Sequence, residues 1–335
     1  MKTKIAINGF GRIGRNAFKI AREREDLEIV AINDLTDTAT LAHLLRYDTN
    51  YGRYGRQVEV SDDGIVVDGQ VVRILAERDP SKLPWGEMEI DIVIESTGRF
   101  TKTEDARQHV MAGAKRVVLS APAKSAGAKT YVLGVNDAEL AEAGEVVSNA
   151  SCTTNCVAPV SAVMEESFGI DRAMLTTVHS YTASQMLQDG PAKDLREARA
   201  AAENIIPTTT GAAIAAAEAL PSLAGKFTGL SIRVPTPVVS LIDVTYLLKR
   251  ETTVEEINAA FITATQQPNW DGILGVTDEP LVTKDFVGDS RSAIVDLSLT
   301  DAVGGNLVKV VAWYDNEWGY CNRLVELVAR LGNQT

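Results

Sequence analysis

Hydrophobic runs alternate with helical periodicities over the first 150 residues. Such alternation of apolar strands with helices is typical of an α/β domain with a parallel sheet covered on both faces. We therefore expect residues 1–150 to form one domain of this class. The predicted strands are Lys4–Asn8, Glu28–Asn33, Asp91–Glu95, Arg116–Ser120, Lys129–Val132 and Val146–Ser148, and the predicted helices are Ile13–Glu25 and Thr103–Gly113.

The pattern changes after about residue 151. One predicted helix is followed by longer strands with turn residues between them and few helices, which predicts an α+β domain with a mainly antiparallel sheet over 151–315. The segment Tyr181–Ala202 lacks periodicity, and we interpret it as a long surface loop running into a helix. A last amphipathic helix, Glu317–Leu331 within 316–335, is expected to pack back on the first domain. The second-domain elements are the helix Cys152–Phe168 and the strands Ala173–His179, Gly229–Val234, Val238–Lys249, Ser292–Ser298 and Leu307–Tyr314.

Composition and charge exclude several classes of protein. No run approaches the roughly 18 apolar residues of a membrane helix, and the N-terminus lacks signal-peptide features, so we expect a cytoplasmic protein with no membrane partner. The net charge of −12 argues against nucleic acid as a main partner. The three cysteines have no metal-ligand spacing, which predicts neither a metal site nor disulfides and leaves a thiol for chemistry.

A glycine motif lies between the first predicted strand and helix. Gly9-Phe10-Gly11-Arg12-Ile13-Gly14 matches G-x-G-x-x-G, which places glycines where a chain turns, approaches a pyrophosphate and packs a helix on a strand. Asp34 ends the next strand, at the position of a carboxylate that binds the ribose of NAD and repels the 2′-phosphate of NADP. We therefore predict a Rossmann-type NAD-binding domain. Arg78 either reaches the adenosine side or is a solvated surface cation.

Cys152 follows a strand and opens a helix. The partial positive charge of a helix N-terminus stabilises a thiolate, so we expect a lowered thiol pKa and a nucleophilic cysteine. Cys156, one turn later, is interpreted as a small buried residue. Ser151 and Thr153 flank the thiol and either donate to an anionic substrate or cap the helix.

The chain has only three histidines from which a catalytic base can come. His43 lies in an apolar helical stretch, and His109 lies in an amphipathic segment where the sequence indicates no polar constellation. His179 ends a strand at the mouth of the long loop and is the best candidate.

Six blocks carry a resemblance to a known family. Together, and in family order, they resemble phosphorylating glyceraldehyde-3-phosphate dehydrogenase over essentially the whole chain. The blocks are Asn8–Arg15 (NGFGRIGR), Ser151–Cys156 (SCTTNC), Thr177–Thr182 (TVHSYT), Ile206–Ala212 (IPTTTGA), Arg233–Pro237 (RVPTP) and Asp315–Tyr320 (DNEWGY).

The resemblance implies NAD-dependent oxidation of glyceraldehyde 3-phosphate to 1,3-bisphosphoglycerate, a step of glycolysis and gluconeogenesis, in a homotetramer. Cys152 would form a hemithioacetal and then a thioester, His179 would take the proton, and inorganic phosphate would release the acyl phosphate. The implied cofactor contacts outside the glycine motif are Thr97, Ser120, Asn316 and Tyr320. The implied substrate contacts are Thr182 and Arg233 for the substrate phosphate, and Ser151, Thr153, Thr210 and Gly211 for the attacking phosphate.

The chain departs from the family pattern in the loop after His179. Ala183 and Ser184 replace an Asn-Asp pair, Gly190 replaces a bulkier apolar residue, and Glu197 replaces an arginine that faces the attacking phosphate. A carboxylate there is expected to weaken phosphate binding. Three alternatives remain open: an altered second substrate such as arsenate, an erythrose-4-phosphate dehydrogenase, and a non-catalytic NAD- or RNA-binding paralogue. The retained Thr182 and Thr-Thr-Thr-Gly run disfavour the second, and the retained Cys152 and His179 disfavour the third.

Overall fold

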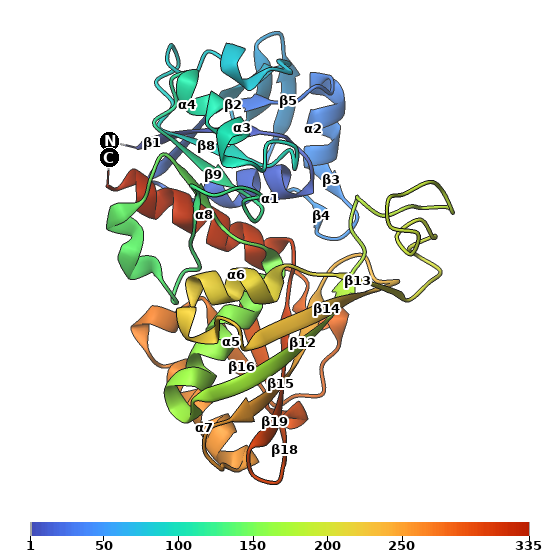
Figure 1. The fold of residues 1–335 in the computed structure, drawn as a ribbon. Helices are drawn as coiled ribbons and strands as arrows, with labels where there is room; N and C mark the ends of the chain where they lie inside the picture. Colours follow the sequence, from blue (N-terminus) through green and yellow to red (C-terminus); the bar gives the residue numbers. More distant parts are fainter. Residues whose placement is uncertain (1, 335) are drawn as a thin grey trace. The chain divides into compact units, whose positions relative to one another are not determined.

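The computed structural model describes residues 2–334 and divides into two compact units (Figure 1). The first unit contains residues 2–131, 138–150 and 321–334, and the second contains 132–137 and 151–320. The long second segment of the second unit begins at Ser151, directly before the cysteine helix. The last helix, α8 (Trp318–Gly332), belongs to the first unit from Cys321 onward.

The first unit is built on a nine-stranded sheet in the order β10-β11-β9-β8-β1-β2-β7-β6-β5. The strands from β10 to β7 pair in parallel, and β7, β6 and β5 continue the sheet as antiparallel hairpins. The bounds are β1 (Thr3–Asn8), α1 (Arg12–Ala21), β2 (Leu27–Asn33), α2 (Thr38–Arg46), β3 (Tyr47–Asp48), β4 (Gly52–Arg53), β5 (Val58–Ser61), β6 (Gly64–Val67), β7 (Gln70–Leu75), β8 (Ile92–Glu95), α3 (Thr103–Ala106), α4 (Gln108–Met111), β9 (Arg116–Leu119), β10 (Lys129–Thr130) and β11 (Val146–Ser148).

The central strands of this sheet are buried on both faces. Every residue of β8 is buried, and Ile92, Val93 and Ile94 have no exposed surface. Because successive side chains of a strand point to opposite faces, this pattern requires cover on both sides. Helix α2 contains the apolar helical stretch described around His43, whereas the hairpins β5–β7 were not predicted.

The second unit contains a mixed, mainly antiparallel sheet in the order β13-β14-β12-β15-β19-β17-β16, with β18 beside β19. Only β12–β14 and β16–β17 pair in parallel. The bounds are α5 (Cys152–Phe168), β12 (Ile170–Ser180), β13 (Ile206–Thr209), α6 (Ala212–Ala219), β14 (Phe227–Val234), β15 (Ser240–Leu248), α7 (Val254–Ala264), β16 (Leu274–Thr277), β17 (Ala293–Asp296), β18 (Asp301–Val303) and β19 (Leu307–Tyr314). The predicted fold class is thus confirmed for both halves of the chain.

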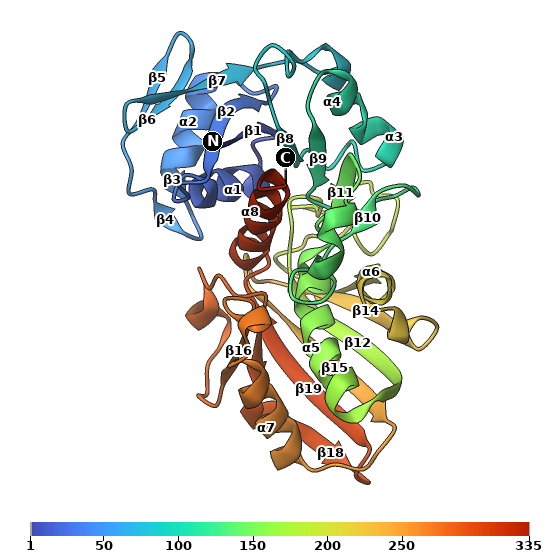
Figure 2. The ribbon, with the colours of Figure 1, turned by 90° about the vertical axis from the view of Figure 1, so that its left-hand side faces the viewer.

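One face of the second sheet carries its core. Burial alternates along β15, where every second residue from Ser240 to Leu248 is buried. This period of two is that of a strand with one face on a core. Helix α5 runs along the sheet and packs on β12, β15, β17 and β19, with α6 and α7 beside it (Figure 2). The N-terminus of α5 is thereby held against the end of β12.

One helix prediction was wrong, and another was confirmed with an interruption. Residues 181–205 contain turns but no helix, so the long segment after β12 does not run into one (Figure 1). The predicted helix Thr103–Gly113 is divided into α3 and α4 by a turn at Arg107. Within residues 2–334, no helix combines the length and the apolar character needed to cross a membrane.

Candidate active site

The glycine motif forms the turn between β1 and α1 in the first unit. Gly9 has φ +94°, a backbone conformation that side chains with a Cβ rarely adopt, and a Cβ at Gly14 would lie 2.1 Å from the Gly9 carbonyl oxygen. A Cβ at Gly11 would meet no protein atom within 4 Å, so this glycine faces open space. Helix α1 begins at Arg12 with Gly11 as its N-cap, and no side chain caps it, which leaves its N-terminus available to an anion.

A cavity of about 490 Å³ lies above this turn. Its lining includes five predicted cofactor residues, namely Gly9, Gly11, Asp34, Arg78 and Thr97, whereas Ser120 is not part of it. Asp34 Oδ2 accepts a hydrogen bond from the Phe10 N–H at 2.8 Å, and each carboxylate oxygen keeps room for a second donor. The open glycine, the uncapped helix and the carboxylate fit a dinucleotide.

The other residues of the glycine motif make contacts within the first unit. Arg12 Nη1 forms an ion pair with Asp48 Oδ2 at 2.5 Å, and the Phe10 ring packs edge-on against Phe18. The Ile13 carbonyl oxygen accepts a weak bond from Cys321 Sγ at 3.5 Å. These residues therefore fix the turn, and the glycines shape the surface of the cavity.

Cys152 lies at the first position of α5 in the second unit. The Ser151 hydroxyl caps this helix by accepting a hydrogen bond from the Thr154 N–H at 3.1 Å. The thiol is half-buried, and its Sγ is 3.4 Å from His179 Nε2. The structure thus brings together the predicted nucleophile and the predicted base, which are 27 residues apart in the chain.

Burial changes the titration of both groups. It raises the pKa of the Cys152 thiol, although the Arg233 charge and hydrogen bonds from Thr153 lower that pKa in part. The expected net lowering by the helix N-terminus is therefore wrong, because desolvation of the thiolate outweighs it. Burial, followed by the charge of Arg233, lowers the pKa of His179 to about 3. His179 is thus a neutral imidazole that can accept a proton.

Arg233 lies beside the catalytic pair because β14 is parallel to β12, with Arg233 in register with His179. Its Nη1 is 2.5 Å from His179 Nδ1 and 3.2 Å from the Ser180 carbonyl oxygen. The guanidinium Nε is buried without a hydrogen-bond partner, and no described residue forms an ion pair with Arg233. A half-buried cation without a carboxylate is a site for an anion.

The orientation of the His179 ring depends on the same two neighbours. The Ser180 carbonyl oxygen, 2.6 Å from Nδ1, can only accept, whereas the Arg233 guanidinium can only donate. When Nδ1 donates to Ser180, Nε2 carries the lone pair and faces the thiol. An anion that draws Arg233 away from Nδ1 favours this tautomer.

The remaining predicted substrate residues lie in the second unit and already have partners. The Thr153 hydroxyl is hydrogen-bonded to the Tyr314 hydroxyl at 2.8 Å, and Thr182 Oγ1 is 3.0 Å from Ser184 Oγ. Thr210 Oγ1 accepts a hydrogen bond from the Ala212 N–H at 3.1 Å, and Gly211 is the N-cap of α6. Together these groups provide hydroxyls and one helix N-terminus but no cation.

Glu197 is the departure that the structure explains most directly. Its Oε1 accepts a hydrogen bond from Thr208 Oγ1 at 2.6 Å. Thr208 pairs with Ser231 on β14, and Ser231 pairs with Thr177 on β12, so Thr208 shares a sheet face with Arg233 and His179. The Glu197 carboxylate therefore takes the hydrogen bond of the Thr208 hydroxyl, on the sheet face that carries His179 and Arg233.

Two further predicted cofactor residues belong to the second unit. The Ser240 hydroxyl donates to Asn316 Oδ1 at 2.9 Å, which fixes the side-chain amide. Tyr320 is buried where α8 begins. Cys156 is fully buried, as predicted.

The interpretation of His109 was wrong. This histidine is wholly buried and lies within hydrogen-bond distance of Trp85, Glu95 and Asn8. The sequence analysis missed the cluster because its members come from four separate segments. A histidine shortly after a strand that ends in a glutamate was the only available signal. His43, in contrast, is exposed.

No group of three or more His, Cys, Asp or Glu side chains among the described residues is arranged to hold a metal ion.

Two family models match the chain. Residues 3–103 match the NAD binding domain of glyceraldehyde 3-phosphate dehydrogenase, and residues 151–316 match its C-terminal domain. The chain is 54% identical to glyceraldehyde-3-phosphate dehydrogenase of Geobacillus stearothermophilus, over 100% of this chain and 99% of the relative. It is 54% identical to the Streptomyces coelicolor protein of that name over the full length of both, and 51% identical to glyceraldehyde-3-phosphate dehydrogenase 1 of Bacillus subtilis over 100% and 99%. Both halves of the fold, the NAD-binding turn and the resemblance carried by the motifs therefore agree, and the chain belongs to the glyceraldehyde-3-phosphate dehydrogenase family.

Proposed function

We propose that this protein oxidises glyceraldehyde 3-phosphate to 1,3-bisphosphoglycerate with NAD and inorganic phosphate, the reaction of glycolysis and gluconeogenesis. The observation that carries the proposal is the 3.4 Å contact between Cys152 Sγ and His179 Nε2 beside Arg233, whose Nε is buried without a partner. A thiol, a neutral base and an anion site are what thioester chemistry on a phosphorylated aldehyde requires.

The first step uses His179 as a general base. As Cys152 Sγ attacks the aldehyde carbon, Nε2 takes the thiol proton, and a hemithioacetal forms on the sulfur. The raised pKa of the thiol makes this transfer necessary, because little thiolate is present beforehand. The Ser180 carbonyl oxygen accepts from Nδ1–H and stabilises the imidazolium.

Arg233 orients the substrate. Its guanidinium, which has no carboxylate partner, binds the substrate phosphate, with Thr182 as a neighbouring donor. This binding removes the cation from Nδ1, which raises the basicity of His179 at the moment when the aldehyde is present. Substrate binding and activation of the base are thereby coupled.

The second step releases the acyl group. The glycine turn and Asp34 of the first unit would hold NAD, and Asn316 of the second unit would bind its nicotinamide amide. Bound NAD would supply the hydride acceptor for oxidation of the hemithioacetal to a thioester. Inorganic phosphate then attacks the thioester carbon, the C–S bond breaks, and the Cys152 sulfur leaves as a thiolate. Ser151, Thr153, Thr210 and Gly211 surround this phosphate in the proposal.

A steady-state assay of reduced-cofactor formation tests the proposal. Turnover is expected to require phosphate, and Cys152→Ser is expected to lower kcat at least about 10³-fold, because a hydroxyl is a far weaker nucleophile. Cys156→Ser, which alters a buried cysteine one turn away, is the matched control and should retain activity. Phosphate-independent turnover, or an active Cys152→Ser variant, would contradict the proposal.

Glu197 favours a second candidate, an enzyme that uses another acyl acceptor in place of phosphate. Its carboxylate takes a hydrogen bond that an anion would otherwise receive from Thr208. Comparison of the Michaelis constants of phosphate and arsenate distinguishes the candidates. A markedly lower constant for arsenate would favour the second.

Self-association is also proposed. The segment 181–205 exposes the apolar side chains of Leu187, Leu195 and Ile205. Such exposure is typical of a surface covered by another protein chain, and a homotetramer of this chain would cover it. Light scattering on the purified protein tests the mass, and a monomer would contradict the proposal.

A further inference from the structure

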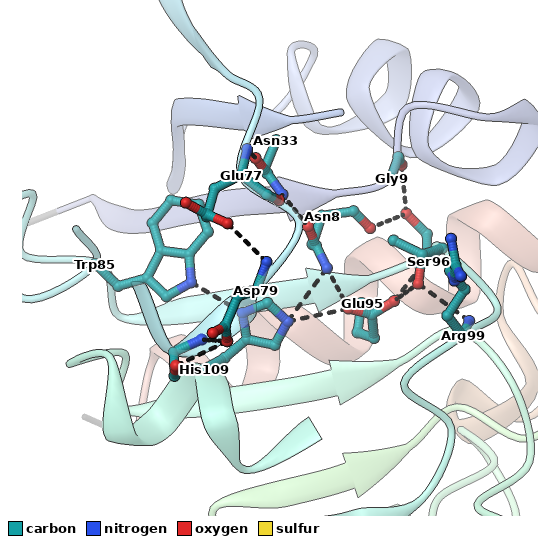
Figure 3. Close-up of polar contacts among 12 residues, drawn as sticks. Asn8, Gly9, Asn33, Glu77, Asp79, Trp85, Glu95, Ser96, Arg99 and His109 are labelled. Atoms are coloured by element: carbon teal, nitrogen blue, oxygen red, sulfur yellow. Dashed lines mark hydrogen bonds and ion pairs between the residues drawn. The ribbon is translucent and has the colours of Figure 1, made fainter. Parts of the chain in front are cut away.

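A row of polar side chains crosses the carboxyl ends of the central strands in the first unit (Figure 3). Glu95 ends β8, Asn8 ends β1, Asn33 ends β2, and Glu77 follows β7. These strands are neighbours in the order β8-β1-β2-β7. Asn8, Asn33 and Glu77 line the cavity above the glycine turn, so the row forms its floor. We name these four residues the polar floor.

The hydrogen bonds of the polar floor fix the orientation of both asparagine amides. The Glu77 N–H donates to Asn33 Oδ1 at 2.8 Å, and Asn33 Nδ2 donates back to the Glu77 carbonyl oxygen at 2.8 Å, which fixes the Asn33 amide. Asn33 Nδ2 also donates to Asn8 Oδ1 at 2.7 Å. Asn8 must therefore present its Nδ2 to the other side, where it donates to Glu95 Oε2.

His109 supplies a second donor to the same oxygen, and Trp85 decides its tautomer. The indole Nε1–H can only donate, and it lies 2.9 Å from His109 Nδ1. Nδ1 therefore accepts, the ring hydrogen is on Nε2, and Nε2 donates to Glu95 Oε2 at 3.0 Å. Trp85 and His109 are both wholly buried, so no solvent competes for these positions.

The other carboxylate oxygen of Glu95 accepts two hydrogen bonds from Thr97. Glu95 Oε1 accepts from the Thr97 N–H at 2.8 Å and from the Thr97 hydroxyl. Four donors thus converge on Glu95, and three of them, the Asn8 amide, the His109 Nε2–H and the Thr97 N–H, can only donate. Glu95 is consequently a buried carboxylate, and no lysine or arginine among the described residues pairs with it.

Thr97 links this carboxylate to the glycine turn. A Cβ on Gly9 would lie 2.7 Å from the Thr97 backbone nitrogen, so the two backbones are in close contact. The Ser96 hydroxyl adds a hydrogen bond to the Gly9 carbonyl oxygen at 2.7 Å. The Thr97 backbone nitrogen, whose N–H donates to Glu95, is thus the same atom that is in close contact with Gly9.

We infer that Glu95 is a positioning residue for the cofactor cavity, oriented by His109 and Trp85. It fixes Thr97 against Gly9 and, through Asn8 and Asn33, fixes the Glu77 backbone beside Arg78. A buried charge is costly unless it is hydrogen-bonded, and here every hydrogen bond of the carboxylate ends on a residue that lines the cavity or on the histidine that orients it. The inference rests on the proposed use of this cavity for NAD.

The substitution Glu95→Gln tests the inference. The amide must place its NH₂ group either toward Asn8 and His109, which are both donors, or toward the Thr97 N–H. The second orientation is expected, because there the amide faces one obligate donor, the Thr97 N–H, and a hydroxyl that can turn to accept. The Thr97 N–H then loses its acceptor. The Kd of NAD, measured by calorimetry without substrate, should rise roughly ten- to hundredfold, as expected for one unpaired buried group. The kcat at saturating NAD should stay within about threefold of the wild-type value.

A second substitution provides a rescue that a merely structural role would not show. Trp85→Phe removes the donor to His109 Nδ1, so the ring can carry its hydrogen there and accept at Nε2. The amide introduced by Glu95→Gln can then turn its NH₂ group toward His109 and its oxygen toward Thr97. The double variant Glu95→Gln/Trp85→Phe should therefore bind NAD more tightly than Glu95→Gln alone. Glu95→Ala, compared with Glu95→Ala/Trp85→Phe, is the matched control and should show no rescue, because no side-chain amide is present to turn.

The outcomes separate the alternatives. A lowered melting temperature with an unchanged Kd for NAD would make the cluster structural only and would overturn the inference, as would the absence of rescue. Should Glu95→Gln fail to fold, His109→Gln tests the same point with the carboxylate retained, and an unchanged Kd there would also overturn it. Because calorimetry requires no turnover, failure of the proposed dehydrogenase activity would be seen separately in the steady-state assay.

Discussion

His109 in the first unit and His179 in the second are both buried near the end of a strand, but their surroundings differ. His109 accepts from an indole at Nδ1 and donates to a carboxylate at Nε2. His179 has the Ser180 carbonyl and the Arg233 cation at Nδ1, and a thiol at Nε2. Each ring nitrogen of His109 faces a group that can only donate or only accept. In His179, by contrast, a hydrogen-bond acceptor and a donor compete for Nδ1, and Nε2 faces a thiol that can lose its proton.

This difference separates a positioning histidine from a reactive one. Both nitrogens of His109 are committed, so any proton transfer would leave a buried donor facing a donor. His179 can change tautomer, because its Nδ1 already has a carbonyl oxygen as acceptor, and its Nε2 is free to take the thiol proton. Burial of a histidine therefore says little about its role until the partners of both nitrogens are known.

The largest expected effect comes from His179→Asn. Loss of the general base should lower kcat about 10²–10⁴-fold, while the Kd of NAD remains near the wild-type value. Steady-state kinetics together with calorimetry measure both quantities. A variant that retains more than about a tenth of the wild-type kcat would remove the distinction between the two histidines.

His109→Phe is the mirror experiment. It leaves the Trp85 N–H and one oxygen of Glu95 short of a partner, so the free energy of unfolding should fall by roughly 2–4 kcal/mol. The kcat at saturating NAD should change by less than about threefold, since no group at the thiol is altered. Denaturant unfolding and steady-state kinetics provide the two numbers. Equal stability of variant and wild type would show that the hydrogen bonds of His109 do not stabilise the fold.

Glu197→Arg examines the anion site near His179. Exchange of an anion for a cation beside Thr208 should lower the Michaelis constant of phosphate by about tenfold, and Glu197→Gln, which keeps an acceptor for Thr208, should lower it less. Glu203→Arg makes the same charge change at an exposed position of the same segment and controls for net charge. If Glu203→Arg had as large an effect, the local role of Glu197 would be refuted.

The smallest effect is a change in the pH dependence of stability. The pKa of His179 is about 3 in the native protein, against about 6.5 for an ordinary histidine, so the unfolded chain binds a proton that the native chain does not between these values. Stability is therefore fully present above about pH 6.5 and is lost as the pH falls toward 3. His179→Asn should reduce the slope by up to about one proton, or about 1.4 kcal/mol per pH unit. Urea unfolding at pH 7, 6 and 5 measures it, and parallel slopes would contradict a neutral His179.

The sequence alone predicted the fold class and the nature of the reactive groups. The glycine turn is local, since Gly9 and Gly14 are separated by five positions and their roles follow from backbone geometry. The position of Cys152 at a helix N-terminus is local in the same sense. The hairpins β5–β7 were missed because each strand is only four to six residues long, and periodicity is weak evidence over so short a run. The helix expected after Tyr181 is absent although the segment contains good helix formers.

What the sequence by itself determined about this protein are properties of single segments: an NAD-binding turn, a cysteine at the start of a helix, a candidate base at the end of a strand, and a family. Only the tertiary structure decided which groups meet. The registry of β14 beside β12 brings Arg233 to His179, and the order β8-β1-β2-β7 aligns Glu95, Asn8 and Asn33. The sign of the Cys152 pKa shift was also decided there, because desolvation depends on the surroundings of the thiol in three dimensions, whereas the helix N-terminus can be read from the chain.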